Sequence, residues 1–377
     1  MDNISRRRFV RMLAGVPFIG IATASVATQR SAFGRNQIEA VELILRRLVD
    51  SGAVPGISYS IGNTTETMTE GAFGSRVVDP RTPMDKDTRC PPASISKQFV
   101  SAGCFLLQQN GTLNLDAALS TYLPDYVLHA NEMTLAQVLT MRSGISMDDE
   151  ACEKPADGKI GDSSLIANLN KQKLDFAPGS HFAYSNCAYN VAGVVIARVS
   201  KMSYASFIEE NFFKPLGMTS SYQLGTRNET NFAQGYGKET HGWKPEPATP
   251  ADKAFASGNL VSTPGDMLRW NRSLLNATVL SRETLKKIFT VPTPHMHYAS
   301  GWFVEPSGVM WHAGTLAGYG TNNMLVPGTG YAITLLSNTP QNDHWKPADT
   351  TIDMYNAASL GPKLPPLLKR SRTTAPH

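Results

Sequence analysis

Strand-like segments at both ends of the chain enclose a long helical middle, and this order limits the folds open to it. Apolar and β-branched runs occur at 57–61, 67–73, 301–305, 309–311, 323–326 and 331–337. Segments so far apart in sequence must meet in one sheet to bury their apolar faces. We therefore predict a mixed sheet from 37–85 and 290–360 and a helical lobe from 86–289, with an active site in the cleft between them.

Helices are predicted where apolar residues recur at intervals of three and four. They are Gln37–Asp50, Leu165–Asn170, Ala188–Val199, Tyr204–Phe212 and a closing helix at Trp345–Ser359. No segment repeats within the chain. We therefore expect one catalytic unit, spanning 28–362.

Ser94–Ile95–Ser96–Lys97 places a hydroxyl three residues ahead of an amine. If this run opens a helix, the Ser94 and Lys97 side chains lie on one face, one turn apart. Lys97 can then take the proton of Ser94, whose hydroxyl is a poor nucleophile without an adjacent base. The alternative is a helix N-terminus with a solvated lysine, because serine and lysine are common residues.

Two further motifs carry groups that would complete such a site. In Tyr184–Ser185–Asn186, a phenol that an ammonium group could activate as a general base lies two residues from an amide donor. His312–Ala313–Gly314 ends an alternating segment predicted to be an edge strand, whose backbone can donate to an oxyanion. Taken singly, Tyr184 and Asn186 could be loop-packing residues, and His312 could be a structural histidine.

With these three motifs in this order, the chain resembles the serine β-lactamase and penicillin-binding-protein-like family, on the side of class C β-lactamases, D,D-peptidases, D-aminopeptidases and related esterases. Further segments are similar to landmarks of that family: Gly111–Asp116, Leu135–Ile145, Phe213–Met218, Ala256–Met267, Tyr298–Trp302 and Leu335–Asn338. The resemblance covers about 37–360. It implies an α/β (α+β) fold of the β-lactamase/transpeptidase-like type, with an antiparallel sheet flanked by helices, a helical lobe and the active site between them.

The resemblance also implies a role for each motif residue. Ser94 would be the acylated nucleophile and Lys97 its activating partner. Tyr184 would be the general base for acylation and for water attack on the acyl-enzyme, and Asn186 would orient the substrate amide. The backbone N–H groups of Ser94 and Thr315 would form the oxyanion hole.

His312 and Gly314 would bind substrate where many relatives carry a Lys-Thr-Gly triad. A lysine there offers a fixed positive charge to a substrate carboxylate. Histidine, with an ordinary pKa of about 6.5, is mostly neutral at pH 7 and is the weaker anchor. This departure argues against a strong β-lactamase rather than against catalysis.

The N-terminal residues resemble an export signal. Ser5–Arg11 matches the twin-arginine pattern, and the mildly apolar stretch 12–27 is too short and too rich in Gly, Pro and Ala for a membrane-spanning helix. We predict a twin-arginine (Tat) signal peptide over 1–27, cleaved after Ala27, with Ala22 and Ala24 as the other frame. The Tat machinery would export the folded protein to the periplasm or beyond, without stable membrane insertion. A retained signal acting as an anchor and a basic disordered N-terminus are the alternatives.

The net positive charge of the chain comes from its two ends. The net charge is +4, yet 1–27 carries +3 and the tail from Lys363 carries another +4, so the remainder is net acidic. We expect 363–377 to be a disordered basic tail and expect no nucleic acid as a partner.

Neither the cysteines nor the histidines indicate a cofactor. Cys90, Cys104, Cys152 and Cys187 are predicted to be buried free thiols, with a Cys90–Cys187 disulfide near the site as the alternative. His295–Met296–His297 has no companion acid nearby, so we predict neither a metal nor another cofactor.

Together these inferences predict an exported serine hydrolase that forms an acyl-enzyme and cleaves an amide or ester. The substrate would be a small molecule or peptide, with peptide-like or D-amino-acid compounds favoured, as in D,D-carboxypeptidases. Carboxylesterase and weak β-lactamase activities of the same family are alternatives. Two classes of protein remain open besides: a ligand-binding or sensor protein without turnover, and an acyltransferase.

Overall fold

A seven-stranded antiparallel sheet forms the centre of the protein. The computed structural model describes residues 34–146, 162–247, 255–293, 297–343 and 345–360. Within them the strands are ordered β3-β2-β1-β11-β10-β9-β8, and every neighbouring pair is antiparallel. Their bounds are β1 (Gly56–Gly62), β2 (Thr67–Val77), β3 (Thr82–Pro83), β8 (Phe303–Val304), β9 (Met310–Leu316), β10 (Tyr319–Val326) and β11 (Tyr331–Ser337). The sheet is antiparallel, as the family resemblance implied, and the mixed sheet suggested by the segment pattern is wrong.

The first and last parts of the chain meet in the middle of this sheet. Strand β1 pairs with β11, so that Ile57 lies opposite Ser337 and Gly62 lies opposite Ala332. Every residue of β1 is buried, because helices cover both faces of the sheet at this position. The predicted association of 37–85 with 290–360 is therefore present.

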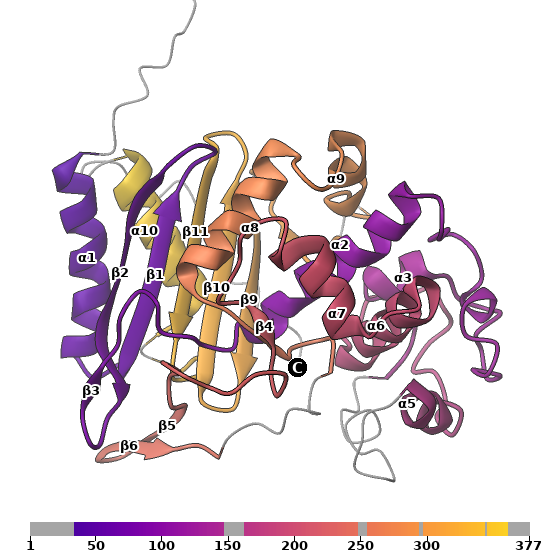
Figure 1. Ribbon diagram of the computed structural model, residues 1–377, viewed down its shortest axis with the longest axis horizontal. Helices are drawn as coiled ribbons and strands as arrows, with labels where there is room; N and C mark the ends of the chain where they lie inside the picture. Colours follow the sequence, from indigo (N-terminus) through magenta and orange to yellow (C-terminus); the bar gives the residue numbers. More distant parts are fainter. Residues whose placement is uncertain (1–33, 147–161, 248–254, 294–296, 344, 361–377) are drawn as a thin grey trace, which may run out of the picture.

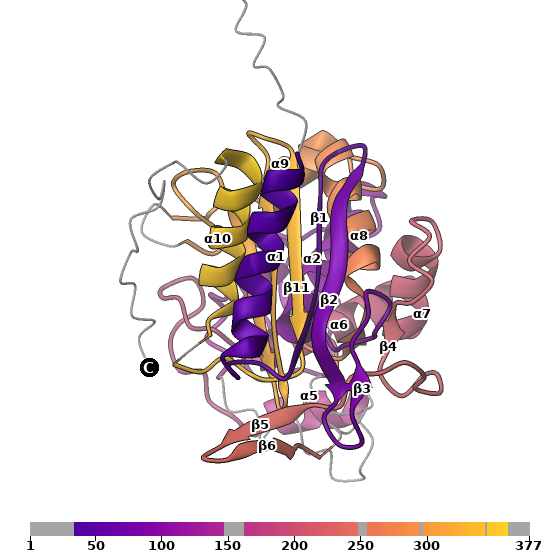
Figure 2. The same cartoon turned by 90° about the vertical axis from the view of Figure 1, so that its left-hand side faces the viewer.

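Helices pack on both sides of the sheet (Figures 1 and 2). On one face, α1 (Arg35–Asp50) packs against α10 (Pro347–Leu360). Helix α1 buries Val41 and Leu45, which lie one turn apart on its apolar stripe. On the other face, α8 (Pro264–Asn276) contacts β1 and β11, and α2 (Ser96–Gln109) leads into the helical lobe.

The lobe surrounds α2 and α6, whose buried residues belong to the largest apolar cluster of the described residues. Its helices and helical turns are η1 (Ala93–Ile95), α2, η2 (Leu119–Thr121), α3 (Leu135–Leu139), α5 (Asp162–Leu169), α6 (Asn186–Ser200), α7 (Tyr204–Ile208), the π-helical turn η3 (Glu209–Phe213) and α9 (Arg282–Ile288). Two short strand pairs that the sequence pattern missed also occur within 86–289: β4 (Tyr222–Gln223) with β7 (Leu260–Val261), and β5 (Tyr236–Glu239) with β6 (Gly242–Pro245).

The cysteines differ from one another. Cys90 and Cys104 are free, fully buried thiols, as predicted. Cys187, at the start of α6, is disulfide-bonded, so the free-thiol prediction is wrong for this residue. A Cys90–Cys187 disulfide is excluded, because Cys90 is free. Cys152 lies outside the described residues.

Among the described residues, no single helix has the length and apolar character needed to cross a membrane. Helix α6 and the segment Tyr204–Phe213, bent by 78° from each other, pass that test only as a pair, by length and composition. Their apolar side chains belong to the lobe core. The predicted signal peptide at 1–27 and the tail at 363–377 lie outside the described residues.

Candidate active site

Ser94 and Lys97 lie on one turn at the junction of η1 and α2. Lys97 Nζ donates a hydrogen bond to Ser94 Oγ at 3.0 Å. Lys97 is fully buried, so the alternative of a solvated lysine is wrong. Ala93, just before the nucleophile, has a φ of +50°, a left-handed conformation that L-residues rarely adopt. Strain of this kind persists only where the surrounding structure enforces it, and it is concentrated at functional sites.

Two further oxygens contact the Lys97 amine. Nζ donates to Asn186 Oδ1 at 2.8 Å and to the Ser257 carbonyl at 2.9 Å. An ammonium group has three donors and no acceptor, so it can make these two contacts and the one to Ser94 Oγ at the same time. The oxygen of the Asn186 side chain therefore accepts a hydrogen bond from Lys97. Asn186 also lies in the site where it was expected to orient a substrate amide.

The Ser257 carbonyl is held in place by a residue that sequence reasoning missed. Asn190 Oδ1, one helical turn after Asn186, accepts from the backbone N–H groups of Ala256 and Ser257 at 3.1 and 3.0 Å. Asn190 is 1% exposed. The sequence feature that could have identified Asn190 is its position four residues after Asn186, on the same face of a helix.

Tyr184 lies on the loop before α6, with its ring beside the lysine. Lys97 Nζ is 4.9 Å from the centre of the Tyr184 ring. Met141 holds this loop, because Ala183 N donates to the Met141 carbonyl at 3.0 Å and Ser185 N donates to Met141 Sδ at 3.2 Å. The Ser185 hydroxyl caps α6 by accepting from Ala188 N. The segment Leu135–Ile145, recognised only as a landmark, thus supports Tyr184.

His312 is buried on β9 and faces the same tyrosine. Its Nδ1 lies 2.6 Å from the Ala313 carbonyl, so Nδ1 carries the proton, and Nε2 lies 3.4 Å from the Tyr298 hydroxyl. Burial, together with the nearby charge of Lys97, lowers the pKa of His312 to about 3. His312 is therefore neutral at pH 7, and its pKa lies well below the ordinary value assumed from the sequence. Tyr298, fully buried and in contact with both rings, is a second residue that sequence reasoning missed.

Gly314 brings β9 against the nucleophile turn. A Cβ atom added to Gly314 would lie 2.3 Å from the Pro92 carbonyl, which also accepts from Thr321 Oγ1 at 2.8 Å. Only glycine allows the strand to approach so closely. The next residue, Thr315, is exposed beside this turn.

In the described part of the sheet, β8 pairs with β9 only at Met310 and Trp311. The stretch from His312 to Leu316 is therefore an edge, as predicted.

The structure thus gathers most of the predicted residues around one amine. Ser94 and Asn186 bind Lys97, and Tyr184 stacks beside it. His312 contacts the Tyr184 ring, with 6.2 Å between ring centres. Within the described residues, no group of three or more His, Cys, Asp or Glu side chains is arranged to hold a metal ion. Of the His-Met-His motif, positions 295 and 296 lie outside those residues.

The fold and this serine–lysine pair are those of one class of protein. The chain belongs to the beta-lactamase family, whose family model matches residues 41–355. Among curated proteins it is similar to Protein flp from Staphylococcus aureus (strain COL), with 27% identity over 312 residues, covering 79% of this chain and 62% of flp. The putative penicillin-binding protein PbpX from Bacillus subtilis (strain 168) is 27% identical over 251 residues, covering 66% of this chain and 62% of PbpX. The chain spans about three-fifths of the length of these relatives.

Solved structures share the fold at lower identity. The D-amino acid amidase from Ochrobactrum anthropi SV3 superimposes with a TM-score of 0.75 at 24% identity, over 85% of this chain and 98% of the amidase. A class C beta-lactamase mutant gives a TM-score of 0.75 at 20% identity, over 85% and 97%. The octameric penicillin-binding protein homologue from Pyrococcus abyssi gives 0.72 at 24%, over 85% and 76%. These likenesses establish the β-lactamase/transpeptidase-like fold.

Proposed function

We propose that the protein is an exported serine hydrolase that forms an acyl-enzyme on Ser94 and cleaves an amide or ester. One observation carries the proposal: a fully buried lysine amine lies 3.0 Å from the Ser94 hydroxyl, beside the Tyr184 ring. A serine hydroxyl needs an adjacent base to act as a nucleophile, and Tyr184, beside the Lys97 amine, is the candidate. Beta-lactamases and amidases, the named neighbours, are hydrolases, which supports this reading.

The geometry suggests how the proton moves. Tyr184, whose ring centre lies 4.9 Å from Lys97 Nζ, would accept the Ser94 proton as Oγ attacks the substrate carbonyl. The backbone N–H groups of Ser94 and Thr315 stabilise the oxyanion. Tyr184 then gives the proton to the leaving nitrogen or oxygen. Deacylation repeats these steps with water as the nucleophile and Ser94 as the leaving group.

The charge around the site indicates which substrates are favoured. Neutral His312 offers no fixed cation to a substrate carboxylate. Amides and esters of D-amino acids are therefore favoured over D,D-carboxypeptidase substrates, whose terminal carboxylate needs an anchor. The fold neighbour from Ochrobactrum anthropi is a D-amino acid amidase complexed with D-phenylalanine, which supports this choice.

The test is hydrolysis of p-nitrophenyl acetate by the protein from residue 28 onward, beside Ser94→Ala. We expect turnover to fall at least about 10³-fold in Ser94→Ala with unchanged circular dichroism, because the nucleophile is lost. Equal rates in the two proteins would contradict the proposal. A burst without turnover would instead indicate the sensor, and acyl transfer to added amines or alcohols would indicate the acyltransferase.

The substrate test compares D-phenylalanine amide with D-alanyl-D-alanine peptides. We expect the amide to be the better substrate by kcat/KM. A preference for the peptides would restore the D,D-carboxypeptidase reading, and a preference for penicillins would indicate a β-lactamase.

Export is proposed from the N-terminal sequence alone. Ser5–Arg11 matches the twin-arginine pattern. Replacing Arg6 and Arg7 with lysine should retain the protein in the cytoplasm of a bacterial host, measured by cell fractionation. Unchanged export in that variant would contradict Tat dependence.

A further inference from the structure

A chain of buried amides joins α2, the helix that follows Ser94, to the centre of the sheet. Asn323 Nδ2 on β10 donates to Gln98 Oε1 on α2 at 3.0 Å. Asn323 and Asn271, on α8, exchange two further hydrogen bonds at 2.7 and 2.8 Å. The Thr334 hydroxyl on β11 donates to Asn323 Oδ1 at 2.7 Å. These four side chains are at most 1% exposed, so the bonds form away from solvent.

A tryptophan determines the direction of these bonds. The indole nitrogen of Trp270, which can only donate, lies 3.2 Å from Gln98 Oε1. The Gln98 atom that faces the indole is therefore the oxygen, and the Asn323 atom that faces the same oxygen is the nitrogen. The Asn323 oxygen is then left to accept from Thr334 and Asn271. One orientation of each amide satisfies these contacts.

This network is a poor source of stability. Gln98 Nε2 is buried and has no hydrogen-bond partner among the described residues. An unpaired buried donor destabilises the folded protein, and an apolar side chain of similar size would avoid that penalty. The amide contributes direction instead, because satisfied polar contacts hold the elements that they join in one arrangement.

Strand β10 holds the nucleophile segment at two points. Thr321 Oγ1 donates to the Pro92 carbonyl at 2.8 Å. Asn323, two residues further along and therefore on the same face of the sheet, bonds to Gln98. Ser94 lies between Pro92 and Gln98 in the sequence. A single contact would let the segment pivot against the strand, whereas two contacts fix its orientation.

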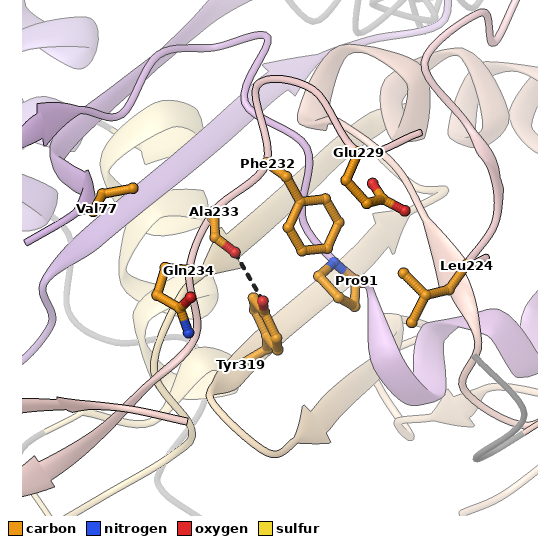
Figure 3. A pocket seen from close by; sticks show the side chains of 8 residues that line it. All are labelled: Val77, Pro91, Leu224, Glu229, Phe232, Ala233, Gln234 and Tyr319. Carbon is orange, nitrogen blue, oxygen red and sulfur yellow. Dashed lines mark hydrogen bonds between the residues drawn. The ribbon is translucent and has the colours of Figure 1, made fainter. Parts of the chain in front are cut away.

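The start of β10 is anchored apart from α2. The Tyr319 hydroxyl donates to the Ala233 carbonyl at 2.8 Å, as Figure 3 shows. The Ala233 N–H donates in turn to the Arg89 carbonyl at 2.9 Å. Strand β10 is also paired along both edges, with β9 and with β11. It is therefore the fixed element, and the Gln98 contact positions α2 against it.

Strand β9 takes its place in the site from β10. Asn323 lies opposite His312, and Gly320 lies opposite Thr315. The Thr315 N–H is one of the two expected oxyanion donors, and the Ser94 N–H is the other. Such donors act over a narrow range of distances, so their separation must be held closely. That separation depends on how α2 lies against β10.

We propose that Gln98 and Asn323 are positioning residues for the reaction at Ser94. Their hydrogen bond holds the start of α2 against β10 and so keeps Ser94 in register with Thr315 on β9. The inference rests on the proposed function, since it assumes that Ser94 is the nucleophile. It adds a buried contact, outside the groups that touch substrate, on which the rate depends.

The first test removes the amide of Gln98. Gln98→Met keeps the length of the side chain, and we expect kcat for p-nitrophenyl acetate to fall about tenfold through misplacement of the oxyanion donors, with KM within about twofold of the original. Ser60→Ala is the matched control, because it removes a buried hydrogen bond of 2.8 Å to the Pro264 carbonyl, which joins β1 to α8 rather than to α2. It should leave kcat within about twofold. An unchanged kcat in Gln98→Met, or an equal loss in Ser60→Ala, would overturn the proposal.

A double variant shows whether the two residues act through one contact. Asn323→Leu should lower kcat at least as far as Gln98→Met does. Combining the two substitutions should lower it no further than about twofold below Asn323→Leu alone, because the shared contact is already lost. Losses that multiply would overturn the proposal. If circular dichroism shows that Asn323→Leu does not fold, Asn323→Ser takes its place in the comparison.

Covalent labelling separates this inference from the proposed function. An alkyl fluorophosphonate should label Ser94 of the original protein and label Gln98→Met about tenfold more slowly. No labelling of Ser94 in the original protein would contradict the proposed function, on which the inference rests. Labelling of both proteins at equal rates would overturn the positioning role alone and leave the proposed function standing.

Discussion

Lys97 and His312 lie beside the same tyrosine ring, yet their surroundings favour different charge states. Lys97 Nζ lies among three oxygen acceptors from Ser94, Asn186 and Ser257. The His312 ring instead lies among the rings of Tyr184, Tyr298 and Phe303, with one carbonyl and one hydroxyl as partners. Acceptors favour an ammonium, whereas aromatic burial disfavours an imidazolium.

The difference shows where this site keeps its positive charge. The charge lies at the nucleophile, where it can assist proton transfer, and His312 supplies none on the strand where a substrate carboxylate would be held. Under the proposed function, such a site would activate a serine without offering a fixed cation to a substrate carboxylate. Each prediction below tests one side of the comparison.

The largest expected effect comes from replacing Lys97, with the replacement of His312 as the comparison. Lys97→Met should lower kcat about 10²–10⁴-fold, because the group that activates Ser94 is lost. His312→Asn, which keeps a donor for the Ala313 carbonyl, should lower kcat less than about tenfold. Steady-state ester hydrolysis measures both, with circular dichroism as the check on folding. Equal losses of kcat in Lys97→Met and His312→Asn would contradict the difference in role between these two residues.

Gly314→Ala tests the contact between β9 and the nucleophile turn. The new methyl group would lie 2.3 Å from the Pro92 carbonyl, so strand and turn must separate. We expect kcat to fall about 10²-fold through misplacement of the oxyanion donors. Gly328→Ala is the control, because its Cβ would meet nothing within 4 Å. Similar activity in the two variants would show that the close approach is unimportant.

Asn190→Ala tests whether the Ser257 carbonyl must be held. Its removal leaves the N–H groups of Ala256 and Ser257 without their acceptor, so that the carbonyl facing Lys97 shifts. We expect kcat to fall about tenfold, as for other residues that orient a functional group. Asn190→Asp, which keeps the oxygen, should recover part of the loss. A pure increase in KM would argue for a role in binding instead.

The smallest expected effect is on acid stability. The pKa of His312 is about 3 in the folded protein and about 6.5 in an unfolded chain, so the unfolded state binds the extra proton between these values. The free energy of unfolding therefore falls as pH falls through this window, by about 1.4 kcal/mol per pH unit from this residue. His312→Asn should reduce the slope by that amount in urea unfolding between pH 4 and 6. Identical slopes would show that His312 titrates normally.

Periodic segments could be predicted from the sequence, and contacts made by backbone atoms could not. The apolar stripe of α1 and the β-branched runs of β1 and β11 determine their own secondary structure, so these elements were found. The spacing of Ser94 and Lys97 was equally informative, because one helical turn fixes which side chains meet.

The missed features depend on tertiary structure. A carbonyl such as that of Ser257 has no residue type that marks it as an acceptor, and Asn190 acts through it. Strands of two residues, such as β4 and β7, are too short to show alternation. The state of Cys187 depends on a partner brought close by folding.

Covalent labelling tests the central claim most directly. The protein and its variants would be treated with an alkyl fluorophosphonate, which reacts with activated serines, and the adduct would be located by peptide mass spectrometry. We predict one adduct on Ser94, with a labelling rate at least about 10²-fold lower in Lys97→Met and within about tenfold of the original in His312→Asn. An adduct on another serine, or undiminished labelling of Lys97→Met, would contradict the account.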